Sequence, residues 1–183
     1  MDIHKEKLDV IDEQENILYQ ETRDNIHQKG LLHREIHVWL YTPSGNIIFQ
    51  KRSPNKDTAP NLLDASVGGH VDMGEKPLES ALKEIQEEAG ILVDGDELIF
   101  MEKSRVDAID SQTGKRNNVI RYIYALAYFG SLKELVPEEG AGEGFFSYSI
   151  NELENLDNNQ RQMFIGKMIS TENILLYKKI IKN

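Results

Sequence analysis

Short runs of apolar and β-branched residues, separated by turn signals, occupy the first third of the chain. Residues 8–19 fit a short hairpin with the polar stretch DEQEN as its turn, and residues 21–28 fit a short helix. The segments His33–Tyr41 and Asn46–Arg52 are rich in β-branched and aromatic side chains, which predicts two strands. The stretch PSGN between them is a strong turn signal.

The spacing of apolar residues becomes helical after Pro77. Pro77 suits a first helical position, because its φ is already helical and its missing N–H would have had no partner. Gly90 suits the left-handed residue that follows a helix end. The apolar residues that recur at helical spacing between them are Leu78, Ala81, Leu82, Ile85 and Ala89. We therefore expect a helix with one apolar face, preceded by a brief strand at residues 65–68.

The remaining pattern predicts further strands and a helical C-terminal part. Residues 97–106, 119–129 and 145–149 are strand candidates, and the polar residues 107–118 are expected to form a loop. Residues 151–183 carry helical patterns. Their expected buried positions are Ile174, Leu175, Ile180 and Ile181. Strands on both sides of one central helix, followed by helices, predict an α/β fold with a mixed sheet.

Length and composition set the class of protein. The 183 residues suit one domain, and 39% apolar residues suffice for an ordinary core. Within it we expect an N-terminal hairpin and helix extension over about residues 1–30, a core over about 31–150, and C-terminal helices over about 151–183. The chain has no cysteine, which excludes disulfides, thiolate metal sites and cysteine nucleophiles.

Charge and hydropathy limit the partners that we expect. A net charge of −10 argues against binding of nucleic acid polymers, which relies on cationic surface. The first residues, MDIHKEKLDVIDEQEN, lack the apolar core of a signal peptide, and no apolar run approaches the length of a membrane span. We therefore expect a cytoplasmic protein without a membrane partner. A homodimer is possible, since dimers are the commonest closed assembly.

Four glutamates give the predicted helix region its chemistry. Glu75 precedes the helix, and Glu84, Glu87 and Glu88 are three and four residues apart, so they share the face opposite the apolar one. Like charges this close raise one another's pKa or recruit a cation. Oxygen ligands of this kind suit Mg²⁺ or Mn²⁺. An isolated acidic helix would be interpreted as a solvated surface, but the wider spacing of the segment favours a metal site.

The segment Gly69–Ile91 resembles the Nudix box, G-x5-E-x7-R-E-U-x-E-E-x-G-U, in which U is aliphatic. The residues that match in register are Gly69, Glu75, Glu84, Ile85, Glu87, Glu88, Gly90 and Ile91. One position departs from the pattern, because Lys83 replaces the arginine. The resemblance implies an α/β/α sandwich fold and a metal-dependent hydrolase.

The resemblance also implies roles for these residues. Glu84, Glu87 and Glu88 would be the metal carboxylates of the catalytic centre, and the carbonyl group of Gly69 would be a further metal ligand. Glu75 would pair with Lys83 and brace the loop against the helix. Lysine keeps the charge of the family arginine but loses its two-pronged geometry, so the brace is expected to be weaker.

The residues before the box resemble the Nudix branch that contains isopentenyl-diphosphate isomerase and its hydrolase relatives. The shared pieces are LLHR, a strand that ends in QKRS, a lysine four residues after its arginine, and GGH at the start of the box. In that branch Arg52 and Lys56 would contact the diphosphate. Without the resemblance, a solvated basic turn would be the favoured interpretation of QKRSPNK.

The same resemblance bears on the histidines. Isomerases of this branch use histidines near His27, His33 and His70 for a second metal, together with downstream glutamates. The corresponding stretch here, KRNNVIRYIY, has no acid. We therefore expect His33 and His70 to be structural or to contact substrate, and His70 is the predicted substrate contact. The isomerase cysteine position holds Gly68.

These observations favour a hydrolase that cleaves a diphosphate linkage in a small organic or nucleoside compound. The organic part is expected near Trp39. The general base stays open between Glu87 and a downstream loop acid, for which PEEGAGEG offers Glu138, Glu139 and Glu143, with Glu143 as the chosen candidate. The alternatives are an isomerase of allylic diphosphates and a binding or regulatory module without turnover. The sequence does not identify the substrate.

Overall fold

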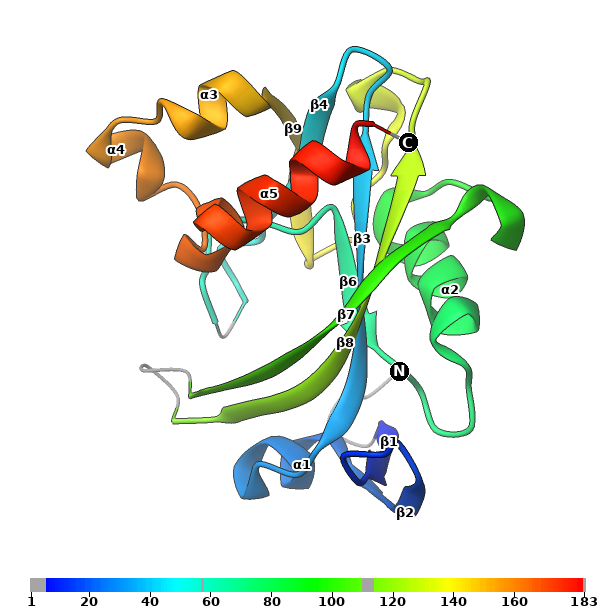
Figure 1. Ribbon diagram of the computed structural model, residues 1–183. Helices are drawn as coiled ribbons and strands as arrows, with labels where there is room; N and C mark the ends of the chain where they lie inside the picture. Colours follow the sequence, from blue (N-terminus) through cyan, green and yellow to red (C-terminus); the bar gives the residue numbers. More distant parts are fainter. Residues whose placement is uncertain (1–5, 57, 110–113, 183) are drawn as a thin grey trace.

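The computed structural model describes residues 6–56, 58–109 and 114–182. Its N-terminal part is an antiparallel hairpin of β1 (Lys7–Ile11) and β2 (Ile17–Thr22), followed by α1 (Arg23–Lys29) (Figure 1). The side chain of Asp12 accepts the backbone N–H groups of Gln14 and Asn16, each at 2.9 Å, and closes the turn. The predicted hairpin and helix are therefore confirmed.

The central sheet is mixed. Its strands are β3 (His33–Tyr41), β4 (Asn46–Arg52), β5 (Leu63–Asp64), β6 (Val67–His70), β7 (Ile99–Ile109), β8 (Arg116–Ala127) and β9 (Gly142–Ser149). Their order is β5-β4-β3-β8-β7, with β6 paired to β3 and β9 paired to β4. Strands β3 and β8 run parallel and the other paired strands run antiparallel. The predicted bounds of β3 and β4 are confirmed.

One face of the sheet is covered by α2 (Pro77–Ala89), which has the bounds that the sequence predicts. Gly90 ends the helix in the left-handed conformation, with φ 71°, and its N–H donates to the carbonyl of Gln86. The fully buried Ile85 packs in one cluster with Ile36 of β3. The predicted apolar face is narrower than expected, because Leu78 is 37% exposed.

The other face is covered by the C-terminal helices: α3 (Ile150–Glu154), α4 (Asn158–Arg161) and α5 (Thr171–Ile180), with the short 3₁₀ helix η4 (Gly166–Ile169) before α5 (Figure 1). Tyr177 of α5 is fully buried against Trp39, with ring centroids 4.7 Å apart. Ile174 and Ile180 are buried as predicted, but Leu175 is 55% exposed, so its prediction was wrong. Helices on both faces of a mixed sheet confirm the α/β/α sandwich.

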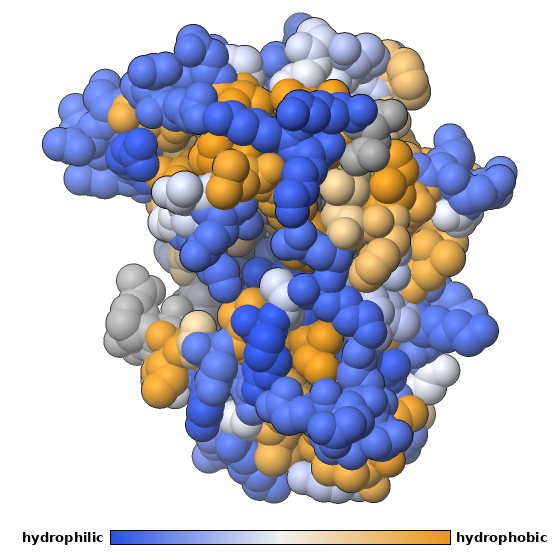
Figure 2. All heavy atoms as spheres, viewed as in Figure 1, coloured by the Kyte–Doolittle hydropathy of each residue, from blue (hydrophilic) through white to orange (hydrophobic). Residues whose placement is uncertain are grey.

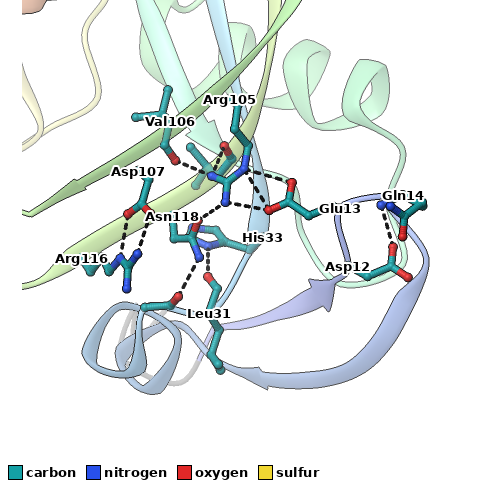
Figure 3. Close-up of polar contacts among 12 residues, drawn as sticks. Asp12, Glu13, Gln14, Leu31, His33, Arg105, Val106, Asp107, Arg116 and Asn118 are labelled. Carbon is teal, nitrogen blue, oxygen red and sulfur yellow. Dashed lines mark hydrogen bonds and ion pairs between the residues drawn. The ribbon is translucent and has the colours of Figure 1, made fainter.

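Strands β7 and β8 extend into the stretch that the sequence predicted to be a loop. Asp107 and Arg116 lie on the two strands and form a salt bridge across them (Figure 3). The Arg105 guanidinium reaches Glu13 at the tip of the N-terminal hairpin, 3.1 Å away (Figure 3). The polar residues therefore make cross-strand contacts instead of a loop. The centre of the predicted loop, residues 110–113, lies outside the described residues.

Figure 2 shows apolar patches broken by hydrophilic residues, and the outline is indented between the α5 region and the β7–β8 hairpin. Among the described residues, no helix has the length and apolar character needed to cross a membrane.

Candidate active site

The end of β6 brings a pair of glycines against the acidic side of α2. Strand β6 pairs with β3 over Val67–His70, so Gly68 lies opposite His37 in the register. The backbone N–H of Gly68 donates to the Glu88 carboxylate at 3.0 Å. Gln50 of β4 donates to the carbonyl of the same glutamate at 3.2 Å. The helix and the strand end are therefore joined at Glu88.

Glu84 lies one helical turn earlier and faces Gly69. A Cβ atom at Gly69 would overlap the Glu84 side chain, with Cγ 2.8 Å away and the carboxylate nearer still. The Glu84 carboxylate therefore occupies the space that a side chain at position 69 would fill. Glu87 is exposed on the helix, yet its charge still acts on Glu84.

Burial and mutual repulsion act on the two inner carboxylates. Burial, followed by the charges of Glu88 and Glu87, raises the pKa of Glu84 to about 8. Burial raises the pKa of Glu88 to about 7, against the opposing effects of the Gly68 N–H and of Lys56. A cation would remove the cost of charging both groups. The observed donors are oxygen atoms only, which fits Mg²⁺ or Mn²⁺.

A stability test follows from these pKa values. A carboxyl with a raised pKa binds its proton more tightly in the folded state, so metal-free protein loses stability as pH rises towards the folded pKa. Between pH 7 and 8.5 Glu84 should cost about 1 kcal/mol, or roughly 2–4 °C in melting temperature. Histidines with lowered pKa values gain stability as pH rises. In the unfolded chain they are already mostly neutral above pH 7, since their ordinary pKa is near 6.5, so they offset only part of the Glu84 effect.

The measurement is a thermal melt in chelator at several pH values. Glu84→Gln should flatten the slope, because it removes the titrating group, and saturating Mg²⁺ should reduce it in the unmodified chain. A melting temperature that is constant or rises from pH 7 to 8.5 in metal-free protein would contradict the assignment of raised pKa values.

The loop between β6 and α2 is braced differently from the prediction. Lys83 forms its salt bridge with Asp72, whereas Glu75 accepts the hydroxyl of Ser80 at 2.6 Å. The predicted Glu75–Lys83 pair is therefore replaced by two separate contacts. The flexible lysine side chain reaches the nearer carboxylate of the loop, and no sequence signal marked Asp72 for this role.

Comparison with known proteins identifies the family. A model of the NUDIX domain matches residues 31–165. The chain belongs to the Nudix family. An uncharacterized Nudix hydrolase of Clostridium acetobutylicum is 41% identical over 100 residues, which are 53% of this chain and 48% of that protein. YfcD, an uncharacterized Nudix hydrolase of Escherichia coli, is 36% identical over 86 residues, 47% of this chain and 48% of that protein.

These curated relatives match the chain over about half of their own length. Solved structures agree in fold. A Deinococcus radiodurans protein has a TM-score of 0.66 and 21% identity, covering 96% of this chain and 99% of that chain. A MutT protein from Methanosarcina mazei has a TM-score of 0.60 and 15% identity, covering 83% and 96%. The matched region contains the whole Nudix box, so the glutamates described above are the box residues of this chain.

The two basic residues before the Nudix box lie in different surroundings. Arg52 donates to the carbonyl of Thr58 and forms a salt bridge with Asp64 at 2.9 Å. Lys56 lies close enough to Glu88 for its charge to oppose the rise in that pKa. The charge of Lys56 therefore acts on Glu88, whereas Arg52 holds the loop that follows β4. The sequence did not indicate this structural task for Arg52.

Arg52→Ala should therefore destabilise the fold. The lost charge-assisted hydrogen bonds contribute about 1.5–3 kcal/mol, and a chain of this size loses roughly 2–4 °C per kcal/mol. Differential scanning calorimetry measures the change, with Lys56→Ala as the matched control that removes a cation without breaking an observed contact. Equal melting temperatures for the two variants would show that the Asp64 and Thr58 contacts contribute nothing.

Two other candidates are engaged in contacts of their own. Trp39 is 1% exposed and packs between Phe49 and Tyr177, so it has no surface to offer a substrate in this structure. Its prediction as a substrate contact is corrected on that ground: the outer helix α5 covers the strand position. Glu143 pairs with Lys51 at 2.6 Å. Glu138 from the same acidic loop acts on Glu88 instead, because its charge raises the pKa of that carboxyl.

The histidines gather at one end of β3. The ligand nitrogens of His27, His33 and His70 all lie within 4.8 Å of one another. Burial lowers the pKa of each, that of His33 to about 4, so the rings are neutral near pH 7. His33 Nδ1 lies 3.0 Å from the carbonyl of Leu31 (Figure 3), and its buried Nε2 has no partner in the described structure. Three neutral imidazoles at this spacing suit a transition metal ion.

Proposed function

We propose that this chain is a divalent-metal-dependent hydrolase that cleaves a diphosphate linkage in a small organic or nucleoside compound. The observation that best supports the proposal is the placement of Glu84 and Glu88 against the Gly68–Gly69 backbone. Two partly buried carboxylates with raised pKa values cost stability when charged without a cation. A Nudix-type metal site accounts for that arrangement.

The proposed metal ligands are Glu84, Glu87, Glu88 and the carbonyl group of Gly69. When bound there, Mg²⁺ or Mn²⁺ would neutralise phosphate charge and acidify the attacking water. Lys56 would hold phosphate oxygens beside Glu88, because an ammonium group is a compact partner for phosphate. Asp72, Lys83 and Glu75 would keep the loop in place.

The proposed general base is an acid near the carboxylates. Glu138 is favoured over Glu143, because Glu138 acts on Glu88 whereas Glu143 is paired with Lys51. Glu87 is the alternative, since it is exposed and borders the site. A carboxylate within reach of the attacking water would take its proton as the water attacks the phosphate.

Two rivals remain, and one assay separates all three functions. An isomerase of allylic diphosphates would move a double bond by proton transfer at carbon without releasing phosphate, and a regulatory module would bind without turnover. Here Gly68 stands where the resembling isomerases have cysteine. Purified protein with Mg²⁺ or Mn²⁺ is incubated with a panel of diphosphates, and monophosphate release and allylic rearrangement are both followed. Metal-dependent release supports the hydrolase; rearrangement alone, or binding without turnover, would overturn it.

A further inference from the structure

The N-terminal hairpin contacts the loop that joins β6 to α2, residues 71–76 (Figure 1). Leu8 of β1 forms an isolated antiparallel bridge with Asp72 of this loop. The backbone N–H of Met73 donates to the carbonyl of Lys7 at 3.3 Å. Leu8 is itself fully buried in the small apolar cluster of the hairpin and α1. The loop therefore lies against β1, and the burial of Leu8 holds that strand in place.

Asp9 joins the hairpin to this loop through a buried carboxylate. The residue is 2% exposed. Its Oδ2 atom accepts the backbone N–H of Gly74 at 3.0 Å and the guanidinium group of Arg34 at 3.1 Å. Its Oδ1 atom accepts the side-chain amide of Gln20 at 3.3 Å. The N–H of Val71 donates to the carbonyl of Arg34 at 3.0 Å. Asp9 and Arg34 therefore hold the loop at two points.

The loop that Asp9 holds connects one proposed metal ligand with the others. It begins two residues after Gly69 and runs into α2, which carries Glu84 and Glu88. Because the connection is short, a displacement of the loop would change the position of Gly69 relative to the helix. A metal site that uses both elements therefore depends on where the loop is fixed.

The contact of the loop with α2 is the weaker of its two attachments. Lys83 reaches Asp72 from the helix, and the Lys83 side chain is 44% exposed. A salt bridge that is open to water contributes little to stability. The Asp9–Arg34 pair has side chains that are only 2% and 13% exposed, and removing one partner of a buried pair is strongly destabilising. The hairpin is therefore expected to fix the loop more firmly than the helix does.

The hairpin lies outside the matched family domain, since the match with the NUDIX domain begins at residue 31. Inside the domain, Lys83 replaces the arginine of the box and lacks its two-pronged geometry. The attachment at Asp9 thus comes from the N-terminal extension of this chain, at a loop whose attachment within the domain is weak.

We propose that Asp9 is a positioning residue for the Nudix site: it holds the loop between β6 and α2 from the N-terminal hairpin and so keeps Gly69 in place relative to the carboxylates of α2. The proposal rests on the proposed metal-dependent hydrolase. The role requires no contact with metal or substrate, because Asp9 acts through Gly74 and Arg34.

The alternative is that Asp9 only stabilises the fold. Its loss would then lower the melting temperature, whereas the folded protein would keep its Mg²⁺ affinity and its kcat. A positioning role predicts that both quantities fall in protein that is fully folded. Contacts that orient metal ligands from outside typically contribute about tenfold to a hundredfold in metal affinity or activity.

Asp9→Ala and Asp9→Asn test the proposal in the full chain. Asp9→Ala removes every contact of the carboxylate, and we expect Mg²⁺ affinity and kcat each to fall about tenfold to a hundredfold. Asp9→Asn should have an intermediate effect, because its amide oxygen can still accept the Gly74 N–H while the charge beside Arg34 is lost. Calorimetric titration measures the affinity below the melting temperature of each variant. Mg²⁺ is the probe because the nitrogen ligands of the histidine cluster suit it poorly.

Asp12→Ala is the matched control on the same hairpin. The side chain of Asp12 accepts the N–H groups of Gln14 and Asn16 in the turn, so its removal loosens the hairpin and leaves the contacts between Asp9 and the loop in place. This variant should keep its Mg²⁺ affinity and kcat. Wild-type values in both folded Asp9 variants, or equal losses in Asp12→Ala, would overturn the proposal. If neither Asp9 variant folds, Asp9 serves the fold and the proposal fails.

The Mg²⁺ titration also separates this proposal from the hydrolase function. If the wild-type chain binds Mg²⁺ and Glu88→Gln loses that binding, the metal site is present whether or not a diphosphate is hydrolysed. Binding that depends on Asp9 without any turnover would reject the hydrolase and keep the positioning role. Metal-dependent turnover that is insensitive to Asp9 would do the reverse. A wild-type chain that binds no Mg²⁺ would reject both.

Discussion

Replacing Glu88 by glutamine should lower kcat about a hundredfold or more, with little change in the fold. The side chain keeps its size, and its amide can still meet the Gly68 N–H through its oxygen, but the charge that would hold a metal is lost. A metal ion that assists water attack on phosphate stabilises the transition state by several kcal/mol. Each 1.4 kcal/mol is about a factor of ten in rate. Glu84→Gln should have a similar effect.

The control for this prediction lies on the same helix. Glu79 is exposed and accepts the backbone N–H of Lys76 at 2.9 Å, a contact that glutamine preserves. Glu79→Gln should keep both rate and melting temperature. Steady-state rates at saturating Mg²⁺, together with metal titration by calorimetry, give the comparison. Near-normal turnover in both Glu84→Gln and Glu88→Gln would reject the metal site at the helix.

Gly69→Ala should abolish most activity while the protein still folds. A Cβ at this position overlaps the Glu84 side chain, and the far end of that flexible side chain can swing away at modest cost to folding. The carboxylate would be displaced from its position beside Gly69, so a metal site that used Glu84 and the Gly69 carbonyl together would lose its geometry. A misplacement of about 1 Å costs on the order of a hundredfold in rate.

Gly166→Ala serves as the matched substitution, because a Cβ at that glycine meets no atom within 4 Å. It should keep wild-type rate. Circular dichroism and a thermal melt establish that the Gly69→Ala variant is folded, and calorimetric titration with Mn²⁺ reports its metal site. Wild-type metal affinity and rate in a folded Gly69→Ala protein would show that Glu84 and Gly69 do not act together.

Helix ends and strand positions were predicted correctly where the local sequence preference agreed with the packing of the folded chain. Pro77 and Gly90 marked the ends of α2 because each favours a backbone conformation that those positions require. The apolar runs of β3 and β4 marked strands buried on both faces. Leu175 was predicted to be buried but is exposed, because the docking of α5 turns Leu176 and Tyr177 to the core. That rotation depends on contacts with Trp39 and Phe49, which are distant in sequence.

For the candidate site, the sequence predicted the shared helix face of the carboxylates but missed the partner of Lys83 and the burial of Trp39. The spacing of Glu84 and Glu88 placed both carboxylates on one helix face, and a second element was needed to show that this face meets the β6 glycines. Lys83 has several acids within reach along the chain, and only the folded loop decides that Asp72 is its partner. Trp39 has a large aromatic side chain of the kind that stacks on ligands, but α5 covers it.

The sequence alone determined the Nudix box, the acidic face of α2, the positions of β3 and β4 along the chain and the absence of cysteine chemistry, because these depend on residue type and short-range spacing. The tertiary structure decided which charges meet. In the folded chain Arg52 forms a salt bridge with Asp64, and Arg121 forms one with Glu35. The charge of Lys56 acts on Glu88. Three histidines from separate segments lie together. Such pairings join residues far apart in the chain, and Coulomb interactions depend on distance in space, which chain separation does not specify.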